Sequence, residues 1–178
     1  MLTDRTASYV GRVWRYVPRN GHPLNVGYIL RASGRWNRAG EYGCLYTSLS
    51  ADGCRAEYFR YLEALNLRPE DDAPRDVASI RVRVSGVLDL TSRSVRARVA
   101  RKLALSETIP TKRLRGDDPV DLALCLAIAD WARAEGYVAI ISPSAASRET
   151  KNLNIFIDIA GPDRLRLDAG SDREALNY

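Results

Sequence analysis

Residues 118–141, DPVDLALCLAIADWARAEGYVAII, decide the fold class because they place a helix directly before a buried strand. Asp118 is a good N-cap, Pro119 suits the first helical position, and Gly136 suits the residue that follows the last turn. The helix is apolar on most faces, so we expect it to be central. The apolar run 137–141 is typical of a buried strand. A helix and a sheet therefore share one core.

Shorter elements surround this helix–strand unit. Alternating or β-rich segments predict strands at 9–17, 44–47, 80–85, 153–159 and 164–167. Ser50 can cap a helix that runs to about residue 65, and Thr91 or Ser92 can cap a basic helix through residue 105. Turn-rich or polar loops are expected at 18–25, 34–43, 68–75 and 142–151. The sequence predicts one α+β domain over residues 1–178, with several strands and about three helices.

The size and composition are ordinary for a soluble globular domain, with 178 residues, 46% of them hydrophobic and 28% charged. The N-terminal residues MLTDR are followed by no apolar run, so we expect no secretory signal. The most apolar stretch, 120–134, is short and contains Asp121, Asp130 and Arg133, which argues against a membrane span. We therefore expect a cytoplasmic protein with no membrane partner.

The chain has few of the side chains that usually bind transition metals. Its three cysteines are Cys44, Cys54 and Cys125, and its single histidine is His22. An odd number of cysteines without C-x-x-C spacing fits neither a closed zinc site nor a disulfide framework. We expect reduced thiols, two or three of them buried, and no metal.

The net charge of +5 reflects 27 basic residues against 22 acidic ones, and only Lys102, Lys112 and Lys151 among the basic residues are lysines. A basic balance suits an anionic ligand, a nucleic acid or an acidic partner protein. The arginines are spread along the chain instead of forming one tail. This distribution favours a dinucleotide phosphate or an acidic partner over nucleic acid.

Two early segments combine arginine with aromatic residues. In the first predicted strand, Arg15 lies between Trp14 and Tyr16. If buried, its guanidinium could bind a phosphate or ribose through paired hydrogen bonds; if exposed, it would stack on Trp14 or reach solvent. The sequence GRWN at residues 34–37 combines a glycine that lets backbone approach a ligand, a charge, an aromatic anchor and a turn former. The alternative interpretation of residues 34–37 is a loop held in place by the buried side chain of Trp36.

A tyrosine and a glutamate follow on neighbouring elements. Tyr46 lies on a predicted strand and Glu57 on the next helix, 11 residues later, so both side chains can reach one cleft. The alternative for Glu57 is a solvated helical residue that pairs with Arg60 or Arg55.

In this order, these residues resemble the RES domain of bacterial toxin–antitoxin systems. The second half of the chain resembles the family's closing pattern through Gly136-Tyr137, Ile140, Pro143-Ser144-Ala145 and residues 152–156, NLNIF. The resemblance spans about residues 13–156. The family usually has two glycines before Arg-Trp, and here Ser33 takes the first place. Residues 68–118 match no motif and give no information about the site.

The resemblance implies a fold and an activity. The fold would be ADP-ribosyltransferase-like, with a split, mainly antiparallel β core flanked by helices and NAD+ in the cleft. The protein would be a toxin that cleaves the nicotinamide–ribose bond of NAD+ by hydrolysis or phosphorolysis, or that transfers ADP-ribose. A cognate antitoxin would cover the cleft, and nucleic acid would be bound only through that antitoxin.

The resemblance and the chemistry of the bond suggest a role for each residue. Glu57 would stabilise the positive charge that develops on the ribose, with Arg15 and Tyr46 beside it as further catalytic groups. Arg15 and Arg35 would bind the pyrophosphate, and Tyr46, with Tyr16, would stack on nicotinamide or ribose. The polar residues Ser144, its rival Ser142, and Asn152 would bind the substrate or, for Asn152, hold the loop.

Three other functions are compatible with parts of this pattern. A protein ADP-ribosyltransferase would use the same bond cleavage and a target protein as the acceptor. A basic nucleic-acid-binding module would use the arginines with tryptophan and tyrosine stacking, but would leave Glu57 without a role. A domain without activity would only bind an antitoxin. The sequence gives neither the acceptor nor the oligomeric state.

Overall fold

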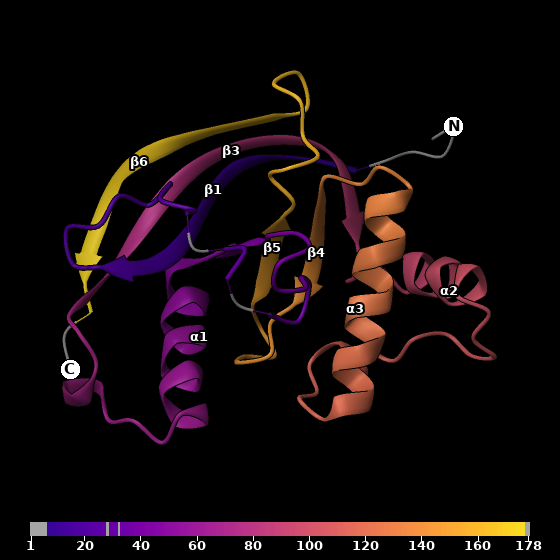
Figure 1. Ribbon diagram of the computed structural model, residues 1–178, viewed down its shortest axis with the longest axis horizontal. Helices are drawn as coiled ribbons and strands as arrows, with labels where there is room; N and C mark the ends of the chain where they lie inside the picture. Colours follow the sequence, from indigo (N-terminus) through magenta and orange to yellow (C-terminus); the bar gives the residue numbers. More distant parts are fainter. Residues whose placement is uncertain (1–6, 28, 32, 177–178) are drawn as a thin grey trace.

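A single continuous sheet forms the centre of the computed structural model, which describes residues 7–27, 29–31 and 33–176 (Figure 1). Its strands are β1 (Ala7–Pro18), β2 (Leu45–Ser48), β3 (Arg75–Asp89), β4 (Ala139–Pro143), β5 (Lys151–Ile155) and β6 (Leu165–Ala175). The helices of this described part are α1 (Ala51–Ala64), α2 (Arg93–Lys102) and α3 (Pro119–Ala134). Short 3-10 turns lie at Pro69–Asp71 and Thr111–Leu114. The prediction of a mixed α+β domain is confirmed.

The strand pairings close into a ring. β3 is antiparallel to β1 along most of its length, and the C-terminal end of β3 is parallel to β4. β5 is antiparallel to both β4 and β2, and β2 returns to β1 through the pair Trp14 and Ser48. β6 pairs with the edge of β3 that faces away from β1, and it is not part of the ring. The sheet is thus mainly antiparallel, as predicted.

The helices cover the sheet in two groups, with β4 and β5 between them (Figure 1). α1 buries Cys54, Tyr58 and Leu62 against β1 and β3. α2 and α3 pack on the other side, where Val99, Ile128 and neighbouring apolar residues form the largest core cluster. The site described below lies between these two groups, so its residues are held by both.

Several predicted boundaries are wrong for identifiable reasons. The second helix ends at Lys102 instead of Leu105, because the chain turns into the left-handed region at Ala104, with φ of 54°. The last strand runs to Ala175, but its residues are largely charged and exposed, so they carry no hydrophobic signal. β3 has 15 residues instead of the six predicted at 80–85, because its two ends lack strict alternation. β5 ends at Ile155, not Ile159.

α3 begins and ends as predicted, but it is not central. Asp118 caps its N-terminus by accepting from the backbone N–H groups of Val120 and Asp121. Gly136 follows its last turn with φ of 79°. One face is buried, whereas Val120 and several alanines face solvent. The expectation failed because alanine favours helix formation without requiring burial.

A cluster at the start of β3 makes stability dependent on pH. Arg75 binds both carboxylate oxygens of Asp72, at 2.9 and 3.1 Å, and the Tyr58 hydroxyl donates to the same carboxylate at 3.0 Å. The hydrogen bonds from Arg75 lower the pKa of Asp72 below its ordinary value. This carboxylate therefore stabilises the fold above its unfolded pKa of about 3.9, and the stabilisation is lost as pH falls through the lower folded pKa.

We expect Asp72→Asn to lower the free energy of unfolding by about 1 kcal/mol at neutral pH. The difference from wild type should shrink as the pH is lowered below about 4, because Asp72 is then protonated in the wild type too. Urea unfolding across an acid pH series measures both quantities. A difference that stays constant down to about pH 2 would show that Asp72 is not responsible.

Cys44, Cys54 and Cys125 are all free and buried, as expected for structural thiols. Within residues 7–27, 29–31 and 33–176, no helix is long and apolar enough to cross a membrane.

Candidate active site

The GRWN segment is a tight turn whose ends are bonded to each other. The backbone groups of Gly34 and Asn37 face one another, with Gly34 N donating to Asn37 O at 3.1 Å. Between them, Trp36 is buried in the core beside α3 and is only 1% exposed. Arg35 lies outside that core cluster and lines a cavity, to which Trp36 also contributes. The turn therefore uses one side chain as an anchor and presents the other to the site.

Tyr46 of β2 reaches this turn with its hydroxyl group. The hydroxyl donates to Asn37 Oδ1 at 2.9 Å and accepts from Trp36 N at 2.8 Å. Burial raises the pKa of the Tyr46 phenol above its ordinary value, so it remains a neutral donor. The residue is still 39% exposed and lines both cavities described below. Tyr46 is thus fixed at one end and accessible along its ring.

Gly34 is required by this arrangement. A Cβ atom at Gly34 would overlap the Tyr46 hydroxyl and lie 2.8 Å from Asn37 Oδ1. The glycine therefore permits close approach of Tyr46, whereas the sequence suggested close approach of a ligand. We expect Gly34→Ala to lower the free energy of unfolding by about 1–3 kcal/mol, the usual cost of overpacking. Urea unfolding tests this, with Gly161→Ala as the control, since a Cβ at Gly161 meets no atom within 4 Å and the backbone at both glycines is outside the left-handed region. Equal losses in both variants would contradict the steric explanation.

Glu57, on α1, is held by two residues from the far end of the chain. Its Oε1 atom accepts from Ser144 Oγ at 2.6 Å and from Asn152 Nδ2 at 2.7 Å. Asn152 is itself fixed by Ser48, whose hydroxyl donates to Asn152 Oδ1 at 2.9 Å. Neither neighbouring arginine pairs with Glu57: Arg55 binds Asp52 and Glu174, and Arg60 binds Asp117. The alternative of a solvated Glu–Arg pair is therefore wrong.

Ser144 is held firmly behind Glu57. Its hydroxyl accepts from the backbone N–H groups of Ala146 and Ser147, at 3.1 and 3.2 Å, while it donates to Glu57. The side chain of Arg115 donates to Ser144 O at 2.6 Å and also to Ser147 O. Ser142 lies elsewhere, on β4, where its hydroxyl accepts from Asn154 Nδ2 at 3.0 Å. The two rival serines thus differ: Ser144 orients Glu57, and Ser142 lines a cavity.

Arg15 is buried, so the alternative in which its side chain is exposed and reaches solvent is wrong. It is 7% exposed, and its Nη1 donates to Pro23 O at 2.9 Å. Burial lowers the pKa of the Arg15 guanidinium from its ordinary value. Beside it, burial raises the pKa of Tyr16 to about 12, and the Tyr16 ring packs on Tyr58 and Tyr61. Both residues line the larger cavity.

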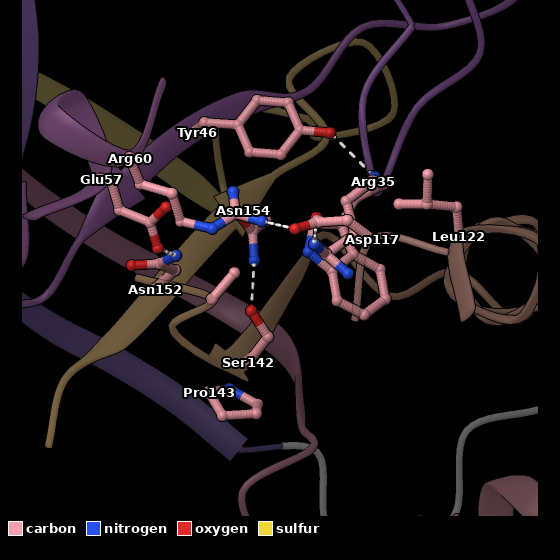
Figure 2. Close-up of a pocket in the computed structure, with 12 residues that line it drawn as sticks. Arg35, Tyr46, Glu57, Arg60, Asp117, Leu122, Ser142, Pro143, Asn152 and Asn154 are labelled. Carbon is pink, nitrogen blue, oxygen red and sulfur yellow. Dashed lines mark hydrogen bonds and ion pairs between the residues drawn. The ribbon is translucent and has the colours of Figure 1, made fainter. Parts of the chain in front are cut away.

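Two cavities meet at Glu57. The larger has a volume of about 740 Å³ and contains Arg15, Tyr16, Ser48 and Glu57 in its lining. The smaller, about 240 Å³, is shown in Figure 2 with Arg35, Arg60 and Ser142 around it. Four residues line both: Tyr46, Glu57, Arg60 and Asn152. Together they offer the space that a ligand of dinucleotide size needs.

The family model of the RES domain matches residues 12–177 of this chain. The chain belongs to the RES domain family. Its fold is similar to that in the crystal structure of the M. tuberculosis MbcT–MbcA toxin–antitoxin complex, with a TM-score of 0.73 and 23% sequence identity. That match covers 96% of this chain and 86% of the other. At this identity the likeness shows the fold alone. No curated protein matches the chain.

The RES domain gathers the predicted site residues, with Glu57 at the junction of the cavities. Arg15 and Tyr16 line the larger cavity, Arg35 and Ser142 the smaller one, and Tyr46 and Asn152 line both. Ser144 stands behind Glu57 instead of in either lining. Whether these residues act in binding or catalysis stays a prediction.

Sequence reasoning missed several residues of this RES domain's site. Asn154 binds Ser142 and Arg60 lines both cavities, while Asn37, which was expected only as a turn former, also binds Tyr46. Asp117 and Arg115 come from residues 68–118, which carried no motif. Arg60 could have been found, because it lies three residues after Glu57 and therefore on the same side of α1. Asp117 gave no local signal, since its contacts are 57 and 82 residues away in sequence.

The described part of this RES domain contains no group of three or more His, Cys, Asp or Glu side chains that could hold a metal ion. Its charged site groups are instead arginines and single carboxylates, which suit an organic anion.

Proposed function

We propose that this RES domain binds NAD+ across the two cavities and breaks the bond between nicotinamide and ribose. The observation that carries the proposal is the orientation of Glu57. Both hydrogen bonds from described residues go to Oε1, so Oε2 is available to a ligand at the junction of the cavities. A carboxylate held in this way supports charge stabilisation without reorganisation.

The chemistry of the bond explains why a fixed carboxylate is useful. As the bond to nicotinamide breaks, positive charge moves onto the ribose ring in an oxocarbenium-like transition state. Glu57 would stabilise that charge and accept a hydrogen bond from a ribose hydroxyl. Ser144 and Asn152 would act as positioning residues, because each holds Oε1 and leaves the other oxygen to the substrate.

The remaining residues would bind the substrate on either side of Glu57. Arg15 and Arg35 would bind the pyrophosphate, whose two negative charges match guanidinium groups. Tyr46 would stack on nicotinamide or ribose, helped by Tyr16. We place the fold with the ADP-ribosyltransferases, with the substrate cleft between the α1 side and the α3 side of the sheet.

We further propose that the protein is the cytoplasmic toxin of a toxin–antitoxin pair and that an antitoxin covers the cleft. The fold likeness to a chain from a toxin–antitoxin complex supports this. The exposed ring of Tyr61 supports it too, because Tyr61 lines the larger cavity, and Phe59 and Leu65 are further exposed apolar residues on and next to α1.

The test is to incubate the purified protein with NAD+ and to follow free nicotinamide. Release in buffer alone indicates hydrolysis, and release that requires phosphate, with ADP-ribose 1″-phosphate as product, indicates phosphorolysis. Release only with cell lysate, together with label on a protein, indicates ADP-ribosyl transfer to a target. No nicotinamide under any of these conditions would refute the proposed activity.

A further inference from the structure

Arg35 and Arg60 share one carboxylate at the smaller cavity (Figure 2). Arg35 Nη2 lies 2.6 Å from Asp117 Oδ1, and Arg60 Nη2 contacts Asp117 Oδ2. The side chains of Arg35 and Arg60 are 13% and 29% exposed, whereas that of Asp117 is 61% exposed. Two partly buried cations thus share a single anion that stands largely in solvent.

This bonding pattern is that of an occupied anion site. One carboxylate offers one oxygen to each of two guanidinium groups, as a phosphate group does when two arginines bind it. A ligand with two negative charges would balance the two arginines better than one carboxylate does. The exposed position of Asp117 makes its ion pairs weak, so a bound ligand can replace it.

The position of Arg60 on α1 fits the nearer phosphate of a dinucleotide. Arg60 lies three residues after Glu57, and such pairs have Cβ atoms about 5–6 Å apart on the same side of a helix. In NAD+, only a few bonds separate the ribose carbon that loses nicotinamide from the nearest phosphate. With Glu57 at the ribose, the Arg60 guanidinium is therefore within reach of that phosphate.

We propose that Arg60 joins Arg35 in binding the pyrophosphate of NAD+, and that Asp117 occupies this anion site in the free protein and is displaced by the substrate. The proposal rests on the proposed function, because it names the group of NAD+ that this part of the site binds. Asp117 is then a built-in competitor that lowers the affinity for the substrate.

The loop that carries Asp117 does not depend on this carboxylate. Arg35 also donates to Gly116 O, and Arg115 donates to Ser144 O on the opposite segment at 2.6 Å. These bonds hold the loop in place when the Asp117 side chain leaves the arginines. A substitution at Asp117 is therefore a clean test of the site's electrostatics.

The first experiment replaces Asp117 with Asn and measures ADP-ribose binding by calorimetry. We expect the dissociation constant to fall about three- to tenfold, because the competing charge is gone. The KM for NAD+ should fall as well. Asp158→Asn is the matched control, since it makes the same charge change at an Asp–Arg pair, with Arg133, away from both cavities. An unchanged or weaker affinity in Asp117→Asn, or an equal gain in Asp158→Asn, would overturn the proposal.

The second experiment removes a cation from α1. We expect Arg60→Gln to weaken ADP-ribose binding about tenfold or more and to leave binding of adenosine, which has no phosphate, unchanged. Arg55→Gln is the control, because Arg55 lies on the same helix but pairs with Asp52 and Glu174 and lines neither cavity. Equal losses for adenosine and ADP-ribose would assign Arg60 a merely structural role and refute the proposal.

A double variant links the two residues. In an Arg60→Gln background, Asp117→Asn should give a smaller gain in ADP-ribose affinity than in the wild type, since one of its two partners is missing. The measurements with ADP-ribose and adenosine use binding alone, so they stand apart from the cleavage assay. A wild type that binds ADP-ribose with the expected pattern but releases no nicotinamide refutes the proposed reaction and supports the anion site.

Discussion

Glu57→Gln is expected to lower kcat for nicotinamide release by about a hundredfold or more, with a much smaller effect on ADP-ribose binding. Glutamine keeps the shape of the side chain but not its negative charge, so the charge that develops on the ribose loses its counterpart. Loss of one preorganised group of this kind costs about 3–4 kcal/mol of transition-state stabilisation. Ser144 and Asn152 can still hold the side chain through its amide oxygen, which limits structural change.

Nicotinamide release under saturating NAD+ measures this effect. Glu63→Gln is the matched control, because Glu63 lies on the same helix, is exposed, and lines neither cavity. The urea unfolding midpoint of both variants should stay close to that of the wild type. If Glu57→Gln retains full kcat, Glu57 has no part in the mechanism and the proposed role must be abandoned.

Trp36→Ala should lower the free energy of unfolding by about 3–5 kcal/mol. The indole is 1% exposed and packs in the core cluster with residues of α2 and α3. Its loss leaves a cavity and also frees the turn that positions Arg35 and Tyr46. A loss of this size is a large fraction of the stability of an ordinary domain.

Urea unfolding followed by circular dichroism measures the loss in Trp36→Ala. Phe59→Ala serves as the control, because Phe59 is 43% exposed on α1 and its removal should cost well under half as much. A loss below about 1 kcal/mol in Trp36→Ala would mean that the turn is not held by its tryptophan. The GRWN segment would then need another anchor.

The sequence was most informative where short-range rules apply. The caps of α1 and α3, the end of α3 at Gly136, and the mixed class follow from residues a few positions apart. The charged strand β6 was largely missed, because pairing with β3 decides it and hydrophobic pattern does not. The closure of the ring by Trp14 and Ser48 is a long-range pairing of the same kind.

The site could be predicted from the sequence only as separate motifs. Glu57, Arg15 and Tyr46 were singled out, yet their contacts join segments up to 95 residues apart in sequence. The roles of Ser142 and Ser144 could not be separated, because Pro143 lies between them and only the strand's geometry sends one hydroxyl to Asn154 and the other to Glu57. Asp117 could be identified only from the folded structure, because the loop that brings it to the smaller cavity contains no motif.

The long sequence separation of the Glu57 partners has a consequence during synthesis on the ribosome. Ser144 and Asn152 are made 87 and 95 residues after Glu57, so the carboxylate emerges long before the groups that orient it. Domains fold as units once their parts are available. A nascent or prematurely terminated chain that ends before Ser144 therefore lacks an assembled centre. For a protein that consumes NAD+ as proposed, destructive activity would begin only after Ser144 and Asn152 have been made, which gives a co-produced inhibitor time to act.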